Sequence, residues 1–245
     1  MLMSVIDGAR TAPSYPELAG KRVLITGLTS TCGVDVARAF GEHKCRLVLQ
    51  FAETSETMQT VAEIVAPAAL DIKAYGPVGS ATDDVVQFAR AAAQAYGGLD
   101  VVVNLVSLAP AEVAPSATTA DIENLVAARL ALPFLLGQII ANRMSVVWTE
   151  GLLLNIAALA EPPNRTKQAF ATVIKAALTG MTRAQAEEWA TRGIRCNAIT
   201  PRPAHSGAGP SLSGEPDMAA LALYLASGRG KALSGCVFEA ETTAS

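Results

Sequence analysis

The chain has 245 residues, of which 51% are hydrophobic and 17% are charged, and its formal net charge is −3. This length and composition suit one compact α/β domain with a large buried core, and they exclude a disordered chain. The slightly negative charge gives no electrostatic reason to expect nucleic acid or an anionic membrane as a partner.

The first segment, residues 1–20, contains two prolines and no periodic pattern, so we expect an N-terminal arm before a single domain over 21–245. Within that domain, short aliphatic runs alternate with segments of helical periodicity. The predicted strands cover residues 22–26, 46–51, 72–75, 100–103, 152–156, 195–199 and 235–238, and the predicted helices cover 33–43, 58–65, 83–96, 121–143, 166–192 and 218–226. This alternation predicts an α/β fold with right-handed crossovers, a three-layer, doubly wound parallel sheet of the Rossmann type.

The remaining composition bears on metals and location. Four cysteines are scattered without a C-x-x-C pair and the two histidines lie far apart, so no metal site is expected and reduced thiols are favoured. The N-terminus lacks the apolar run of a signal peptide. The longest apolar segment, residues 130–141, is shorter than a membrane span and contains Pro133. We therefore expect a soluble, cytoplasmic protein with no membrane partner.

A glycine-containing turn follows the first predicted strand, and such a turn can present backbone N–H groups and a helix N-terminus to a pyrophosphate. It resembles the Thr-Gly-x-x-x-Gly-x-Gly turn of the short-chain dehydrogenase/reductase family. Thr26, Gly27 and Gly33 match that pattern, whereas Thr31 replaces the middle glycine and places a Cβ where the phosphates would approach. A plain strand–helix turn that binds nothing is the alternative interpretation.

The resemblance implies NAD or NADP as the cofactor. The family's charged residue at the end of the second strand falls on Phe51 or Ala52, with Glu53 close by, and its adenine-contacting aspartate falls on Pro77 or Val78. These replacements predict weak or absent nucleotide binding. The positions that the resemblance assigns to cofactor contact are Gly27, Thr29, Ser30, Thr31, Cys32, Gly33, Phe51, Asn104, Lys175 and Pro201.

Two later segments extend the resemblance over residues 21–238. Asn104 retains the first residue of the Asn-Asn-Ala-Gly segment that follows the family's fourth strand. Residues 193–201, Gly-Ile-Arg-Cys-Asn-Ala-Ile-Thr-Pro, closely match the family's Gly-Ile-Arg-Val-Asn-x-Ile-x-Pro. Only residues 202–216 then separate the sixth strand from the next helix, a short segment where active relatives close a longer one over substrate.

Of the four catalytic groups that the resemblance implies, this chain keeps only a lysine, Lys175. In the family, a tyrosine one helical turn before this lysine donates a proton, because the ammonium lowers the phenol pKa. Here Ala171 occupies the tyrosine position, Ala158 the serine position at the end of the fifth strand, and Arg129 the asparagine position in the fourth helix. The resemblance therefore predicts the fold of a ketoacyl-reductase-like enzyme with a degenerate active site.

Three functions remain open from the sequence. The first is a noncatalytic partner subunit or scaffold, which would form a homo-oligomer, or a hetero-oligomer with a paralogue of the same family, through the apolar fourth and fifth helices. The second is an active NAD(P)-dependent oxidoreductase on a carbonyl or hydroxyl substrate. The third is a nucleotide sensor that binds without turnover. We expect the first.

Overall fold

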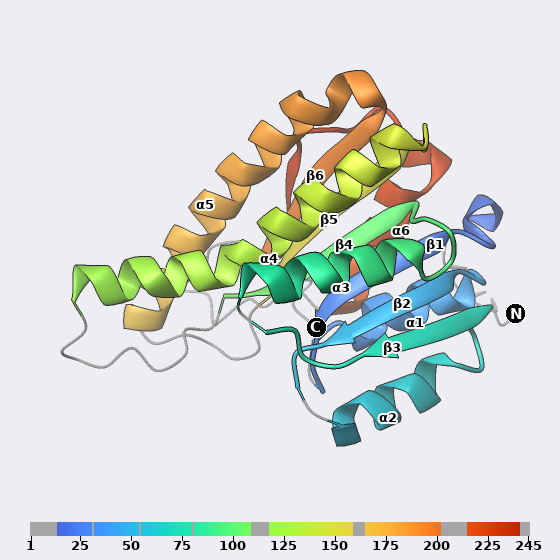
Figure 1. Cartoon of the computed structure of the whole chain (residues 1–245), viewed down its shortest axis with the longest axis horizontal. Coiled ribbons are helices and arrows are strands. Elements are labelled where there is room, and N and C mark those ends of the chain that lie inside the picture. The colour runs from blue at the N-terminus through green and yellow to red at the C-terminus, as the bar shows by residue number, and fades with distance from the viewer. Residues whose placement is uncertain are drawn as a thin grey trace, which may run out of the picture.

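The structure is a computed structural model that describes residues 14–30, 32–53, 55–79, 81–108, 118–158, 165–201 and 215–240. Its centre is a seven-stranded parallel sheet with the strand order β3-β2-β1-β4-β5-β6-β7 (Figure 1). The strands are β1 (Arg22–Leu28), β2 (Arg46–Phe51), β3 (Asp71–Tyr75), β4 (Val101–Ser107), β5 (Gly151–Ala158), β6 (Ile194–Pro201) and β7 (Val237–Ala240). The strand order reverses between β1 and β4, the point at which ligands bind in open α/β sheets.

Helices cover both faces of this sheet. One face carries α1 (Val34–Glu42), α2 (Ser55–Val65) and α6 (Glu215–Ala226), and the other carries α3 (Thr82–Gln94), α4 (Thr119–Val146) and α5 (Arg165–Trp189). Three short 3-10 helices complete the described elements: η1 (Pro16–Leu18), η2 (Ala190–Arg192) and η3 (Gly228–Gly230). The predicted three-layer Rossmann fold is confirmed, and each predicted strand and helix is present within a few residues of its expected bounds.

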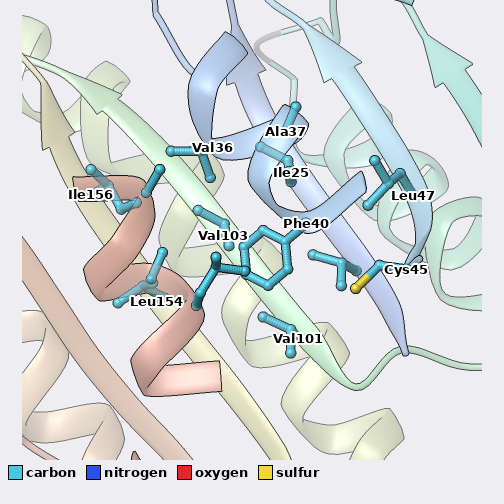
Figure 2. Close-up of a cluster of buried hydrophobic side chains, with 14 of the residues drawn as sticks. Ile25, Val36, Ala37, Phe40, Cys45, Leu47, Val101, Val103, Leu154 and Ile156 are labelled. Atoms are coloured by element: carbon cyan, nitrogen blue, oxygen red, sulfur yellow. The ribbon is translucent and has the colours of Figure 1, made fainter. Parts of the chain in front are cut away.

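The core follows from the aliphatic, two-sided strands. Ile25, Val103 and Leu154 lie on the face that receives the Phe40 ring of α1, and all four side chains are fully buried or nearly so (Figure 2). Both faces of a doubly wound sheet are covered, so its central strands are hydrophobic at consecutive positions instead of alternating. The burial of β1, β2, β4 and β5 accounts for the short apolar runs from which the strands were predicted.

The predicted N-terminal arm is wrong for its last third. Leu18 on η1 is fully buried and Tyr15 is 3% exposed, and both belong to the hydrophobic core. The Tyr15 ring also lies 5.8 Å from the ring of His43, at the end of α1. A single Tyr and a single Leu show no periodicity, so a local pattern does not predict that this segment packs against the domain.

Helix α4 is longer than the apolar segment 130–141 suggested. By length and composition alone it is the one helix among the described residues that could cross a membrane, and only 28% of its most apolar window is buried. Its capping box, in which Thr118 and Asp121 bond each other's backbone N–H groups, starts the helix well before residue 130. The buried face of α4 packs on the sheet through Leu136, Ile140 and Met144. The opposite face leaves apolar side chains uncovered.

Candidate nucleotide and catalytic site

The candidate site lies at the carboxyl end of the sheet, where the turn from β1 to α1 meets the ends of β4, β5 and β6. This placement follows from parallel strands, which bring all their carboxyl ends to one edge. The described site residues come from segments that are far apart in the chain, and the sheet order brings them together.

The turn between β1 and α1 requires its two glycines. Gly27 and Gly33 have φ values of +78° and +90°, in the left-handed region that favours glycine. A Cβ on Gly27 would collide with the backbone oxygen of Leu105, and a Cβ on Gly33 would collide with the Leu105 side chain. Leu105 occupies the position of the family's second asparagine, so an apolar side chain packs directly against the glycine turn.

Three backbone N–H groups of this turn already have partners within the chain. Gly27 donates to Gln50 Oε1 at 2.9 Å, Thr29 donates to the Cys32 oxygen at 3.1 Å, and Ser30 donates a long 3.4 Å bond to Glu53 Oε2. Gln50 is itself 2% exposed and donates to the Phe51 oxygen, so its orientation is fixed. A pyrophosphate at this turn would have to displace some of these contacts.

The N-terminus of α1 keeps the other half of a phosphate site. Helix α1 begins at Val34, and its N-cap residue Gly33 supplies no side-chain hydrogen bond to the first turn. Glycine has no side chain that could cap the helix, and the N-terminus of a helix favours an anion. The carboxylate of Asp35 in the same turn opposes that anion. The backbone shape of the described turn thus fits a dinucleotide, but several of its N–H donors already bond to groups within the chain.

At the end of β2, the position of Phe51 differs from the expected cofactor contact. Phe51 is fully buried in the core, so its side chain has no surface to offer to an adenosine. The exposed residues at this position are Ala52 and Glu53. From sequence alone, a phenylalanine at a strand end could either contact a cofactor or pack in the core. The structure shows that Phe51 packs in the core on the α1 side of the sheet.

Asn104 is part of a buried polar network that crosses three strands and a helix. Thr26 Oγ1 donates to Asn104 Oδ1 at 3.1 Å, Asn104 Nδ2 donates to Asn155 Oδ1 at 3.0 Å, and Asn155 Nδ2 donates to Thr182 Oγ1 at 3.1 Å. All four side chains are at most 2% exposed. The Asn104 side chain therefore supports the strands beneath the site instead of facing a cofactor. The sequence did not single out Asn155 or Thr182, whose roles depend on register.

An apolar cluster contains Ala171, the predicted tyrosine position, and Ala157, the neighbour of the predicted serine position Ala158. Ala157 is fully buried and Ala171 is 7% exposed, and both pack with Val106, Leu108 and Phe170. The expected juxtaposition of the end of β5 with the first turns of α5 is therefore present. Apolar side chains therefore surround Ala171, the position that the resemblance assigns to the tyrosine.

Lys175, the retained catalytic lysine, forms an ion pair with Glu239. Its Nζ lies 2.7 Å from Glu239 Oε1 on β7, and the lysine side chain is 21% exposed. Glu239 is 64 residues away in the chain, and no sequence pattern predicted this contact. The pair joins α5 to the last strand and gives Lys175 a structural role that needs no tyrosine.

One hydroxyl near the serine position was missed. Ser107, the last residue of β4, is in register with Ala158 at the end of β5, and it is exposed. The neighbouring strand supplies this hydroxyl, and a pattern within the β5 segment alone does not reveal it. An alkanol hydroxyl can orient a carbonyl, but it is a far weaker acid than a phenol.

Other predicted positions can be placed only in part. Arg129 is half-buried on α4, beside residues that pack against the apolar cluster, and Cys32 is half-buried in the glycine turn. Pro201 ends β6, opposite Ala240. Thr31 and residues 202–214 lie outside the described residues.

The two buried thiols are protonated near neutral pH and therefore poorly nucleophilic. Burial raises the pKa of Cys45 to about 12 and that of Cys196 to about 12, so neither is a thiolate near neutral pH. Among the described residues, no group of three histidine, cysteine, aspartate or glutamate side chains could hold a metal ion.

The fold and the glycine turn together define a family. A family model for short chain dehydrogenases matches residues 21–215, which is most of the chain. The chain therefore belongs to the short chain dehydrogenase family.

Its relatives include proteins with several activities. The chain is 29% identical to momilactone A synthase of Oryza sativa subsp. japonica, over 89% of this chain and 88% of that protein. It is 28% identical to an uncharacterized oxidoreductase of Thermotoga maritima, over 74% and 71% of the two chains. It is 26% identical to a 3-oxoacyl-acyl-carrier-protein reductase of Synechocystis sp., over 81% and 80%.

Solved structures agree with the fold. A hydroxysteroid dehydrogenase from Escherichia coli superposes with a TM-score of 0.77 at 19% identity, covering 94% of this chain and 99% of that one. A short-chain type dehydrogenase/reductase from Mycobacterium marinum gives 0.75 at 24% identity, covering 91% and 94%. At these identities the likeness shows the fold, and the activity has to be argued from the site.

Proposed function

We propose that this chain is a noncatalytic member of the short chain dehydrogenase family that acts as a partner subunit or scaffold. The observation that carries the proposal is the apolar cluster around Ala171, the position to which the family resemblance assigns the proton-donating tyrosine. Loss of a positioned general acid alone lowers a rate by about 10²–10⁴-fold. The ion pair of Lys175 with Glu239 supports the same conclusion, because the remaining catalytic group already has a structural partner.

The nucleotide turn supports weak or absent cofactor binding. NAD(P), when bound to a family member, supplies the hydride of the reaction, and here the N-terminus of α1 and the turn residues Gly27 to Gly33 would hold its phosphates. The amide of Gly27 is engaged by Gln50 and the carboxylate of Glu53 lies at Ser30, so the cofactor would compete with the chain's own side chains. We therefore expect a dissociation constant well above those of working relatives.

Calorimetric titration with NADH and with NADPH tests this proposal. We expect no saturable heat up to about 1 mM nucleotide, a concentration at which binding is worth only about 4 kcal/mol. Tight, saturable binding without turnover would instead support a nucleotide sensor. The test also needs the partner: co-purification from the native host should recover a second subunit or a defined oligomer, and a protein that is always monomeric would contradict the scaffold proposal.

An active NAD(P)-dependent oxidoreductase is the second candidate, favoured by the dehydrogenase and reductase relatives and by the position of Ser107 beside Ala158. It would show steady oxidation of NADH or NADPH with a ketone or a ketoacyl thioester. That activity should be abolished by Lys175→Ala and reduced by Ser107→Ala. Such a result would overturn the noncatalytic proposal.

A further inference from the structure

A groove on the outer surface runs between α3 and α4, away from the candidate site. The two helices are neighbours in the same layer (Figure 1). The groove has a volume of about 600 Å³, and its walls include Val86, Arg90 and Ala93 of α3, and Ile139, Arg143 and Val146 of α4.

The two walls repeat the same pattern. On each helix an apolar residue is followed by an arginine four positions later and by another apolar residue seven positions later. Positions i, i+4 and i+7 lie on one face of a helix. Each wall is therefore a ridge about 10 Å long, two helical turns, at a rise of about 1.5 Å per residue. A third helix can lay its side chains into a groove between two such ridges.

The charge of the groove is positive. Arg90 and Arg143 are exposed, and in the described part of the chain neither arginine is within ion-pair distance of a carboxylate. No carboxylate lines the groove, whose other polar lining side chains are amides. Beside the groove, Glu188 of α5 accepts a 2.7 Å hydrogen bond from the lining residue Gln138. Two unpaired guanidinium groups over apolar walls match an acidic, amphipathic ligand.

Uncovered apolar side chains extend the groove beyond α4. Val146 is 63% exposed, Val147 is 42% exposed and Trp148 is 89% exposed. Tryptophan and arginine are among the residue types most enriched at binding hot spots.

We propose that the α3/α4 groove docks an acidic amphipathic helix of a protein partner. The apolar stripe of that helix would contact Val86, Ile139 and Val146, its carboxylates would pair with Arg90 and Arg143, and its end would pack on Trp148. The groove adjoins the exposed face of α4 and α5 on which the proposed oligomer rests, because Gln138 lines the groove and donates to Glu188 of α5. The proposed partner is a helix of another protein and not a second subunit, so peptide binding is measured separately from the oligomeric state.

The probe is a synthetic helical peptide of four turns with leucines at i, i+3, i+4 and i+7 and glutamates on both flanks. Its counterpart carries lysines in place of the glutamates. At low ionic strength the glutamate peptide should bind saturably, with an affinity about tenfold higher than that of the lysine peptide. Fluorescence anisotropy of labelled peptide measures both affinities. The double variant R90E/R143E should reverse the preference, so that the lysine peptide binds more tightly.

Controls separate this site from general charge effects. Arg192→Glu changes an equally exposed arginine outside the groove and should leave both affinities unchanged. Trp148→Ala should lower the affinity for the glutamate peptide about tenfold, and the protein should still prefer this peptide to the lysine peptide. Equal binding of the two peptides, or no reversal by R90E/R143E in protein whose melting temperature is retained, would overturn the proposal. So would saturable binding of dodecanoate when the glutamate peptide does not bind, since the groove would then take a small amphiphile.

Discussion

At the scale of single residues, the polar atoms that matter are buried beneath the candidate site. The chain of hydrogen bonds from Thr26 through Asn104 and Asn155 to Thr182 ties β1, β4, β5 and α5 together. A buried amide without a partner costs more than the bond itself contributes, because its hydration is lost and nothing replaces it. Each member therefore depends on the others.

Replacing Asn155 tests this network. Asn155→Leu leaves Asn104 Nδ2 and Thr182 Oγ1 without their partners, and it should lower the free energy of unfolding by about 2–3 kcal/mol. Urea denaturation measures the change. Thr182→Val removes only the last bond and should cost about 1 kcal/mol. A stability of Asn155→Leu equal to that of the wild-type protein would show that the network is not a stabilising unit.

Restoring a phenol at Ala171 tests the apolar cluster. Ala171→Tyr inserts a ring at a position that is 7% exposed, and overpacking of this kind should cost about 1–3 kcal/mol of stability. Ala91→Tyr, at an exposed position of α3, should change stability by less than about 0.5 kcal/mol. We expect no NADPH oxidation by Ala171→Tyr. Measurable turnover by this variant would mean that the nucleotide site is functional and that only the acid was missing.

At the scale of elements, the strands at the switch point are joined at their amino ends by Arg22 and Asp100. Arg22 begins β1, and its backbone N–H and its guanidinium Nε and Nη2 each donate to the Asp100 carboxylate at 2.9 Å. Burial raises the pKa of Asp100, but the hydrogen bonds from Arg22 lower it by more, and the net pKa is below the ordinary value of 3.8. The same contact raises the pKa of Arg22.

Removing the negative charge of Asp100 should lower the free energy of unfolding by an amount that depends on pH. The folded pKa of Asp100 is depressed, so its contribution to stability is present above the unfolded value of 3.8 and is lost as pH falls through the lower folded pKa. Asp100→Asn should cost about 2 kcal/mol at pH 7, and the difference from the wild-type protein should shrink below about pH 4.

Unfolding by urea at pH 7 and at pH 3 checks this prediction. Glu150→Gln is the matched control, because the Glu150–Lys231 pair at 3.7 Å is almost fully exposed and should contribute less than about 0.5 kcal/mol. A cost for Asp100→Asn that does not change with pH would contradict the assigned role of the carboxylate.

At the scale of the whole molecule, the apolar surface left on α4 and α5 needs an explanation. Phe134 on α4 is 44% exposed and Val173 on α5 is 48% exposed. Two helices of one layer that both keep apolar residues on their outer faces favour association with another subunit. This surface supports the proposed oligomer.

A charged side chain on the exposed apolar face of α4 should dissociate the proposed oligomer. Phe134→Glu places a carboxylate within the apolar face, and we expect it to convert the oligomer to a monomer as measured by light scattering. Ile64→Glu changes a side chain of similar exposure, 49%, on α2 at the other face of the sheet, and it should leave the mass unchanged. A wild-type monomer, or an unchanged mass for Phe134→Glu, would exclude α4 and α5 as the interface.

The sequence by itself determined the type and order of the elements, because hydrophobic period and turn residues are local properties. Through the family resemblance it also predicts that Ala158 and Ala171 occupy the serine and tyrosine positions. Element bounds were less certain: β4 continues to Ser107, beyond the predicted residue 103, because its polar end is paired with β5.

Only the tertiary structure decided which groups meet. The pairing of Lys175 with Glu239, the packing of Leu105 on the glycine turn and the placing of Arg90 beside Arg143 all join distant parts of the chain. Such contacts depend on strand order, register and helix placement, which set every long-range distance at once. A local pattern carries no information on them.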